Sequence, residues 1–422
     1  MFQKRSKGIP PRGTWLLTFF FLSSVAETLQ AVAILWASYE LTHNATVTGM
    51  VNAAAYVPGI VLGLVLRKRV DAGHASRLLS LTNGALVVGS SALALVWVAS
   101  SSPDLILVAF AVAQCALSLV KALNKAYVGR VIRQQFPSPR GIRLREQTTS
   151  VALIGGLMGG GAAGLVMDAG VAGWCFGVAA LLYLLSLVAA WRVGARQVTT
   201  WEVDSAAVDP AAPESRPSAT ETVRTPVPQE PSDVRGRLRL ILLYSVPSSG
   251  SLPFISTLTV PLAQAVAPGS STLYSVLTVA GTCGGFLAGA ALSSGRLSSA
   301  TYLNGALVGG GVLAACIAAT LWPPAVVLIM LVLSMVMTGH VMAMQVLTNQ
   351  APAEDQVGRF TVVRNAVAGS AKAGFSLMAG WLAETAGLTT AWLFLAAVLG
   401  VFGVMWWTVR QRTAILRLIS IT

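Results

Sequence analysis

Twelve apolar stretches, each about 20 residues long, recur along this chain of 422 residues. A helix of about 20 apolar residues spans the roughly 30 Å hydrocarbon core of a membrane, so each stretch is long enough for one crossing. Membrane-spanning β-strands would instead give alternating segments of about ten residues, and the sequence has no such segments. The sequence therefore predicts an all-α membrane protein with twelve transmembrane helices. The expected spans are 14–37, 47–66, 78–100, 103–124, 148–167, 171–193, 238–262, 271–293, 300–321, 324–349, 361–384 and 388–409.

Lysine and arginine residues occur almost only in alternate gaps between these stretches. Of the 29 basic residues, 28 lie in the two terminal tails or in gaps on the same side as the tails, and the opposite gaps have none. Basic residues near short loops are retained on the cytoplasmic face of a membrane. The pattern predicts that both termini are cytoplasmic, and the composition rich in Ala, Gly and Leu favours a bacterial inner membrane.

Composition argues against several other classes of protein. A mean hydropathy of +0.70 and a charged fraction of 11% do not fit a soluble protein of this length. The net charge of +13 is spread over several cytoplasmic segments, which indicates contact with membrane lipids and not with nucleic acid. The sequence has no phosphate-binding loop, catalytic triad or metal-ligand cluster, and its four cysteines are isolated. We therefore expect neither an enzyme nor a protein that needs a cofactor or a metal.

A change in composition divides the chain into two halves. Residues 197–236 are rich in proline and hold seven acidic residues. Such a segment cannot bury a hydrophobic core, so it is predicted to be a disordered cytoplasmic linker. The expected organisation is an N-terminal six-helix bundle over residues 1–196 and a C-terminal six-helix bundle over residues 237–422.

The two halves carry related segments. Residues 164–170 read Gly-Leu-Val-Met-Asp-Ala-Gly, and residues 380–387 read Gly-Trp-Leu-Ala-Glu-Thr-Ala-Gly. Each segment connects the fifth predicted helix of its half to the sixth, and each is followed by a tryptophan and a phenylalanine. Parallel repeats of this kind place a substrate cavity at the interface between the halves.

Further sequence features are similar to those of a known family. They are an acidic residue within the first helix (Glu27), the stretch 56–63 (Tyr-Val-Pro-Gly-Ile-Val-Leu-Gly), and Pro352-Ala-Glu354 ahead of Gly358-Arg359. With the paired halves, these features resemble the major facilitator superfamily, and in particular its macrolide-efflux and enterobactin exporters. The resemblance implies a secondary transporter that exports a drug, a natural product or a siderophore (metallophore) by alternating access in exchange for protons. Its partners would be a small-molecule substrate, protons and membrane lipids, and we expect a monomer.

Two motifs of that family are altered in this sequence. In the loop after the second helix, Arg67 occupies the position of the usual aspartate, although Asp71 lies close by. In the antiporter motif of the fifth helix, which covers residues 155–164, Gly160 replaces the proline. Two alternatives to export therefore stay open: uptake of an organic anion, and a membrane sensor of transporter fold that does not transport.

Ionisable side chains within the apolar stretches are the strongest candidates for function, because a charge inside a bilayer is costly unless it is paired or hydrated. Glu27 is predicted to couple transport to protons, since removal from water favours the protonated form of a carboxyl group. Alternatively, it binds a neighbouring helix together with Gln30. His340 is a candidate for proton coupling or substrate contact, although a lone histidine can also be a packing residue. Lys372 is expected to bind an anionic group of the substrate or to pair with Glu27.

Polar and polarisable side chains elsewhere in the helices are further candidates for substrate contact. Gln30, Gln114 and Tyr244 are the polar ones. Basic residues at the inner end of the fourth helix, among them Lys121, are expected to meet lipid phosphates. Methionines crowd the tenth helix and predict either an adaptable apolar wall or ordinary packing. They are Met330, Met335, Met337, Met342 and Met344.

Two segments are candidates for gating. In the seventh helix, Pro247, Gly250 and Pro253 predict a kinked and interrupted helix that either gates the cavity or is a static kink. In the fifth helix, Gly159 and Gly160 belong to a glycine cluster that permits close approach and sliding of helices between the halves.

Overall fold

The computed structural model describes residues 11–60, 75–135, 140–169, 172–194, 231–352 and 357–409. These residues form twelve helices, so the predicted all-α fold with twelve helices is confirmed. The helices are α1 (Pro11–Thr42), α2 (Ala45–Ala54), α4 (Ala75–Ala99), α5 (Pro103–Gln135), α6 (Arg140–Asp168), α7 (Ala172–Gly194), α8 (Pro231–Val266), α9 (Ser271–Ser293), α10 (Ser299–Ala319), α11 (Pro323–Gln350), α12 (Val357–Thr385) and α13 (Leu388–Thr408). Both tails, Arg67 and Asp71, and most of the predicted linker at 197–236 lie outside the described residues.

The helices follow the apolar stretches, with one clear departure. Ten of them are long and apolar enough to cross a membrane. α2 has only ten residues, because the chain turns at Ala55 and Tyr56 before helix resumes at 57–60. Pro58 lies in the first turn of that resumed helix, where a missing backbone N–H costs nothing. The predicted span 47–66 is therefore interrupted, and its last residues lie outside the described ones.

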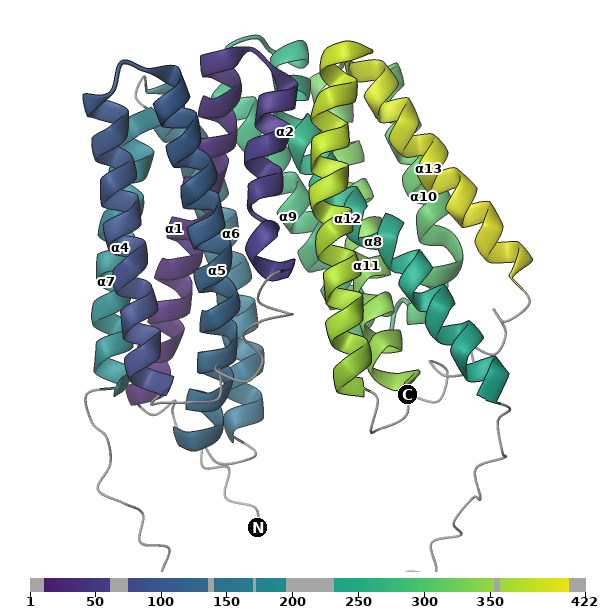
Figure 1. The fold of residues 1–422 in the computed structure, drawn as a ribbon, viewed down its shortest axis with the longest axis horizontal. Coiled ribbons are helices and arrows are strands. Elements are labelled where there is room, and N and C mark those ends of the chain that lie inside the picture. Colours follow the sequence, from purple (N-terminus) through teal and green to yellow (C-terminus); the bar gives the residue numbers. More distant parts are fainter. Residues whose placement is uncertain are drawn as a thin grey trace, which may run out of the picture.

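Two bundles of helices stand side by side (Figure 1). α1, α2 and α4–α7 form the first bundle, and α8–α13 form the second. We call the end of the bundles at which α1 begins the terminal face. The end at which α1 passes into α2 is the opposite face. Figure 1 shows α8 and α12 also starting at the terminal face, so the two bundles run in the same direction.

The bundles meet mainly along two pairs of helices, α2 with α12 and α6 with α9. Glycines permit close approach in both pairs. A Cβ atom on Gly49 of α2 would lie 2.6 Å from the carbonyl oxygen of Ser376, and one on Gly164 of α6 would lie 3.0 Å from the carbonyl oxygen of Ser271 on α9. We call these two contacts the seam. A Cβ atom on Gly160 would touch Thr278 of α9 at an ordinary contact distance of 3.8 Å. Gly160 faces the seam, whereas Gly159 faces α1 within its own half, and a gating role for either stays a prediction.

Glycines of α6 also bring this helix close to α1 inside the first bundle. A Cβ atom on Gly155 would lie 2.7 Å from the carbonyl oxygen of Phe21, and one on Gly159 would lie 3.0 Å from the Cα atom of Val25. Both neighbours are backbone atoms, which cannot rotate away as the end of a side chain can. The packing of α1 on α6 therefore depends on the absence of side chains at these positions.

We expect Gly159→Ala to lower the free energy of unfolding by about 1–3 kcal/mol, the usual cost of overpacking a packed site. Gly177→Ala in α7 is the matched control, because a Cβ atom there would have no neighbour within 4 Å. The control should be neutral or slightly stabilising, since alanine favours a helix more than glycine does. Thermal unfolding of the purified protein measures both variants, and equal midpoints would contradict the close approach of α1 and α6.

The structure of the seventh predicted helix differs from the prediction. α8 is helical without a break from Pro231 to Val266, so the predicted interruption is wrong. Ser256 and Thr257 of α8 both donate to the carbonyl oxygen of Pro253 at 3.0 Å, and α12 packs along α8 and supports the continuous helix. Gly250 lies against the ring of Phe375 on α12. The prolines inside α8 are Pro247, Pro253 and Pro261.

Candidate functional site

A cavity of about 920 Å³ lies between the two bundles. Its walls come from α1, α2, α5 and α6 of the first half and from α8, α9 and α11 of the second. It follows α9 from Tyr274, near the start of that helix at the opposite face, to Ser293, its last residue. The cavity therefore reaches the terminal face, while the seam lies toward the opposite face.

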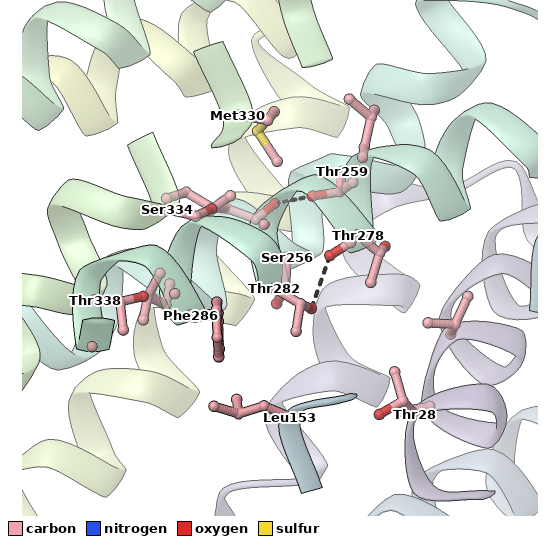
Figure 2. Close-up of a pocket in the computed structure, with 18 of the residues that line it drawn as sticks. Thr28, Leu153, Ser256, Thr259, Thr278, Thr282, Phe286, Met330, Ser334 and Thr338 are labelled. Carbon is pink, nitrogen blue, oxygen red and sulfur yellow. Dashed lines mark hydrogen bonds between the residues drawn. The ribbon is translucent and has the colours of Figure 1, made fainter. Parts of the chain in front are cut away.

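Hydroxyl groups dominate the polar part of the lining, and several of them are close together in Figure 2. Thr278 donates to the carbonyl oxygen of Tyr274 and Thr282 to that of Thr278, both at 3.0 Å. A hydroxyl that donates to its own helix keeps its acceptor lone pairs for a ligand. The ten serines and threonines of the lining are Thr28, Thr149, Ser150, Ser256, Thr259, Thr278, Thr282, Ser293, Ser334 and Thr338.

Apolar side chains form the rest of the wall. Leu153, Phe286, Met330 and Met342 are among them, so two of the five methionines noted in the sequence face the cavity. Met337 and Met344 are buried in the core of the second half instead. The lining therefore suits a solute with both polar and apolar parts.

Asn52 of α2 joins the two halves beside the cavity. Its amide nitrogen lies 2.8 Å from the hydroxyl of Thr257, 3.0 Å from that of Ser256 and 3.2 Å from that of Ser376. An amide NH₂ group has two hydrogens, so it donates to only part of this set at one time. Asn52 is 5% exposed and lines the cavity, so these contacts form part of its floor at the seam.

An ion pair lies in the cavity wall of the first half. The Nζ atom of Lys121 on α5 is 3.0 Å from Oε2 of Glu27 on α1. Each residue lies near the middle of its helix, since α1 has 32 residues and α5 has 33. They are the only charged side chains among the described residues that line the cavity. The side chain of Lys121 is 72% exposed and that of Glu27 is 17% exposed, so the lysine side chain borders the open cavity while its ammonium group contacts Glu27.

The ion pair also borders a second, smaller cavity of about 480 Å³ inside the first half. This cavity is lined by α1, α5 and α6, with Ser23, Asn124 and Thr148 among its polar residues. Ser23 and Thr148 are buried, and Thr82 donates to the side-chain oxygen of Asn124 at 2.6 Å. Glu27 is therefore adjacent to two separate spaces, which is a suitable position for a group that exchanges protons.

Most of the other residues singled out in the sequence lie away from this cavity. Gln30 is buried and accepts a hydrogen bond from Ser90 at 2.7 Å. Tyr244 is buried, and its ring packs against Trp406 at 5.1 Å between centroids. Gln114 is buried as well. None of these three is among the residues that line the cavity.

The two other predicted ionisable residues are also outside the lining. His340 is 1% exposed, and its Nδ1 atom has no hydrogen-bond partner among the described residues. Lys372 on α12 lies at the seam, with its Nζ atom 5.7 Å from the centroid of the Tyr56 ring. Glu27 pairs with Lys121 in this structure, and pairing of Lys372 with Glu27 stays a prediction. Binding of substrate by Lys372 or His340 stays a prediction.

Lys121 is the main residue that the sequence reasoning placed wrongly. The predicted span ended at residue 124, which put Lys121 at a membrane surface beside lipid phosphates. In the structure α5 continues to Gln135, and Lys121 turns toward Glu27. An uncompensated carboxylate in the first helix was the available signal, because it requires a cation on a neighbouring helix.

Two bundles of six helices around a shared cavity, in a chain with repeated helices that can cross a membrane, define a multi-pass membrane transporter. Residues 16–375 match the sequence profile of the Major Facilitator Superfamily, and the chain belongs to this family. No curated protein sequence matches it significantly. The narrower resemblance to macrolide and enterobactin exporters stays a prediction.

Solved structures of transporters have the same fold. A peptide transporter POT in complex with sulfate has a TM-score of 0.68 at 14% identity, with 99% of this chain and 97% of that chain covered. A bacterial metal transporter has a TM-score of 0.65 at 13% identity, with 95% of this chain and 99% of that chain covered. The nucleoside transporter NupG has a TM-score of 0.64 at 12% identity, with 96% of this chain and 98% of that chain covered. Such low identities show the fold alone, which together with the family indicates a transporter and not an enzyme.

Proposed function

We propose that this protein is a proton-coupled secondary transporter that exports a small organic solute across a bacterial inner membrane by alternating access. The observation that carries the proposal is the ion pair of Glu27 and Lys121 in the wall of the central cavity. A carboxylate held in a partly dehydrated site by one cation is a suitable group for taking up and releasing a proton.

The coupling follows from competition for the Glu27 carboxylate. In the paired state this group is an anion beside Lys121. A proton neutralises it and breaks the pair, and a solute that donates hydrogen bonds or carries a cation can occupy the same carboxylate. Proton and solute then exclude each other, which is the thermodynamic condition for exchange of one for the other.

The position of the opening and the charge pattern support loading of the solute from the cytoplasm, which the proposed export requires. The cavity reaches the terminal face, and the basic residues in the loops favour that face as the cytoplasmic one. A solute would therefore load from the cytoplasm in the conformation described here. The hydroxyl groups and the apolar wall fit a drug, a natural product or a siderophore, each of which has both polar and apolar parts.

Exposure of Lys121 supports a second candidate, the uptake of an organic anion. Protonation of Glu27 would leave the ammonium group of Lys121 without its partner in the cavity, and an anionic solute could then bind to it. In that case proton and anion bind together and move in the same direction. The two candidates therefore differ in whether the proton competes with the solute or assists it.

Inverted and right-side-out membrane vesicles distinguish these functions. Inverted vesicles are given a pH gradient with the acid side inside, and right-side-out vesicles one with the acid side outside. Both kinds are tested with ethidium, a labelled macrolide, a labelled catecholate siderophore and labelled organic anions. We expect accumulation of at least one of the first three in inverted vesicles, abolished by a protonophore. Accumulation of anions only, in right-side-out vesicles, would favour uptake. No gradient-driven or exchange flux in either orientation would contradict transport and favour a sensor.

A further inference from the structure

The repeated segments at 164–170 and 380–387 each hold an acidic residue four positions after a glycine. Gly164 and Asp168 lie on α6, and Gly380 and Glu384 lie on α12. Residues four positions apart lie on the same face of a helix. Both α6 and α12 belong to the seam, so each pair faces a helix of the other half.

In the first pair, Asp168 binds the start of α9 in the second half. Its Oδ1 atom accepts from the backbone N–H of Ser271, the first residue of α9, at 2.9 Å. Its Oδ2 atom accepts from the backbone N–H of Thr272 at 3.1 Å, and the hydroxyls of both residues donate to the same carboxylate. A Cβ atom on Gly164 would lie 3.0 Å from the carbonyl oxygen of Ser271, so the glycine permits this approach.

In the second pair, Glu384 binds the start of α2 in the first half. Its Oε2 atom accepts from the backbone N–H of Ala45, the first residue of α2, at 2.9 Å. A Cβ atom on Gly380 would lie 3.0 Å from the Cα atom of Thr46. The helices that receive the two carboxylates are each the second of their half, and the helices that carry them are each the fifth.

The N-cap residues show why the carboxylates are needed. Asn44 and Ser270 precede the two helices, and each accepts from the N–H three residues later, Val47 at 3.1 Å and Leu273 at 3.2 Å. Each cap therefore leaves the first N–H of its helix to another acceptor. A carboxylate from the other half takes that place, where the helix dipole also favours negative charge.

We infer that Asp168 and Glu384, at corresponding positions of the two halves, are acid latches that hold the halves together at the opposite face and must release before the cavity can open there. Each latch crosses the seam, and each would lose its N–H groups if the halves separated at that face. The terminal face needs no such release in the conformation described here, because the cavity already reaches it. Asp168 and Glu384 thus favour the conformation that is closed at the opposite face.

A single reporter cysteine tests this inference without any transport assay. Thr278→Cys places a thiol in the cavity wall, in a background where Cys115, Cys175, Cys283 and Cys316 are replaced by serine or alanine. A membrane-impermeant maleimide is then applied from the opposite face or from the terminal face of sealed vesicles. Asp168→Ala and Glu384→Ala are each expected to speed labelling from the opposite face about 2- to 30-fold, the range for loss of a helix cap. Because the two latches lie on different helices, the double variant should give roughly the product of the two factors.

Asp104→Ala is the matched control, since Asp104 is an exposed acid in the first turn of α5, a helix that is not part of the seam. It should leave both labelling rates unchanged. General loosening of the fold would speed labelling from both faces, whereas loss of a latch should not speed it from the terminal face. If the alanine variants fail to insert, Asp168→Asn and Glu384→Gln keep an acceptor oxygen without the charge and should give smaller increases of the same kind. Unchanged labelling in a folded double variant, or an equal increase in Asp104→Ala, would overturn the inference.

Discussion

Glu27→Gln is expected to bind solute and to exchange it across the membrane, but to lose accumulation driven by a pH gradient. Glutamine keeps the size of the side chain and a hydrogen-bonding group beside Lys121, but it cannot take up a proton. A one-for-one exchange with protons can sustain about tenfold accumulation for each unit of pH difference. In the variant this ratio should fall to about one, because solute movement is then independent of the gradient.

The matched control for this variant is Glu40→Gln, on the same helix. Glu40 is exposed near the end of α1 at the opposite face, away from the central cavity. The Glu40→Gln variant should accumulate solute as the unchanged protein does. Transport is measured in proteoliposomes with the solute identified in the vesicle experiment, once with an imposed pH gradient and once as exchange at equal pH. Full concentrative transport by Glu27→Gln would exclude Glu27 as the coupling group.

Lys121→Met is expected to move the pH dependence of transport, which Glu27→Gln cannot do. Methionine keeps the length and apolar body of the side chain but removes the cation that stabilises ionised Glu27. The carboxylate of Glu27 then lacks the cation that pairs with it in the cavity wall, so exchange of proton and solute at this position should be disturbed. We expect gradient-driven transport to be strongly reduced near neutral pH and its pH profile to differ from that of the unchanged protein.

The double variant Glu27→Gln/Lys121→Met separates coupling from folding. Removal of Lys121 alone leaves the mostly buried carboxylate of Glu27 uncompensated, whereas removal of both charges of a pair is often tolerated. The double variant should therefore unfold at a temperature closer to that of the unchanged protein than Lys121→Met does. The difference should be modest, since the side chain of Lys121 is largely exposed. An unchanged pH profile for Lys121→Met would show that the ion pair does not control the proton.

Hydropathy alone was sufficient to predict the membrane fold, because each crossing needs a long apolar helix and leaves a strong signal in the sequence. The break in α2 was missed, since the mean hydropathy over about 20 residues hardly changes with a turn of two residues at Ala55 and Tyr56. The interruption expected in α8 was wrong for the opposite reason. Proline usually ends a helix in water, but here the packing of α12 and other neighbouring helices along α8 stabilises a continuous one.

The candidate site was predicted in part. Glu27 could be found, because a carboxylate inside an apolar stretch must have a partner or a role. Lys121 was assigned to the membrane surface because a lysine near the predicted end of a helix has the same local sequence whether it meets lipid or a carboxylate. The latches were missed because Asp168 and Glu384 follow apolar stretches and resemble ordinary solvated loop residues. Only the contacts across the seam distinguish them.

Proton movement on solute binding tests the central claim most directly. Purified protein in weakly buffered detergent solution is mixed with the transported solute, and the pH change is followed with an indicator dye. If the Glu27–Lys121 pair exchanges a proton for the solute, binding should release protons from the unchanged protein near the pH of half-maximal transport. Glu27→Gln should bind the solute and release none. Equal proton release by Glu27→Gln, or solute binding by the unchanged protein with no proton release at any pH, would contradict the account.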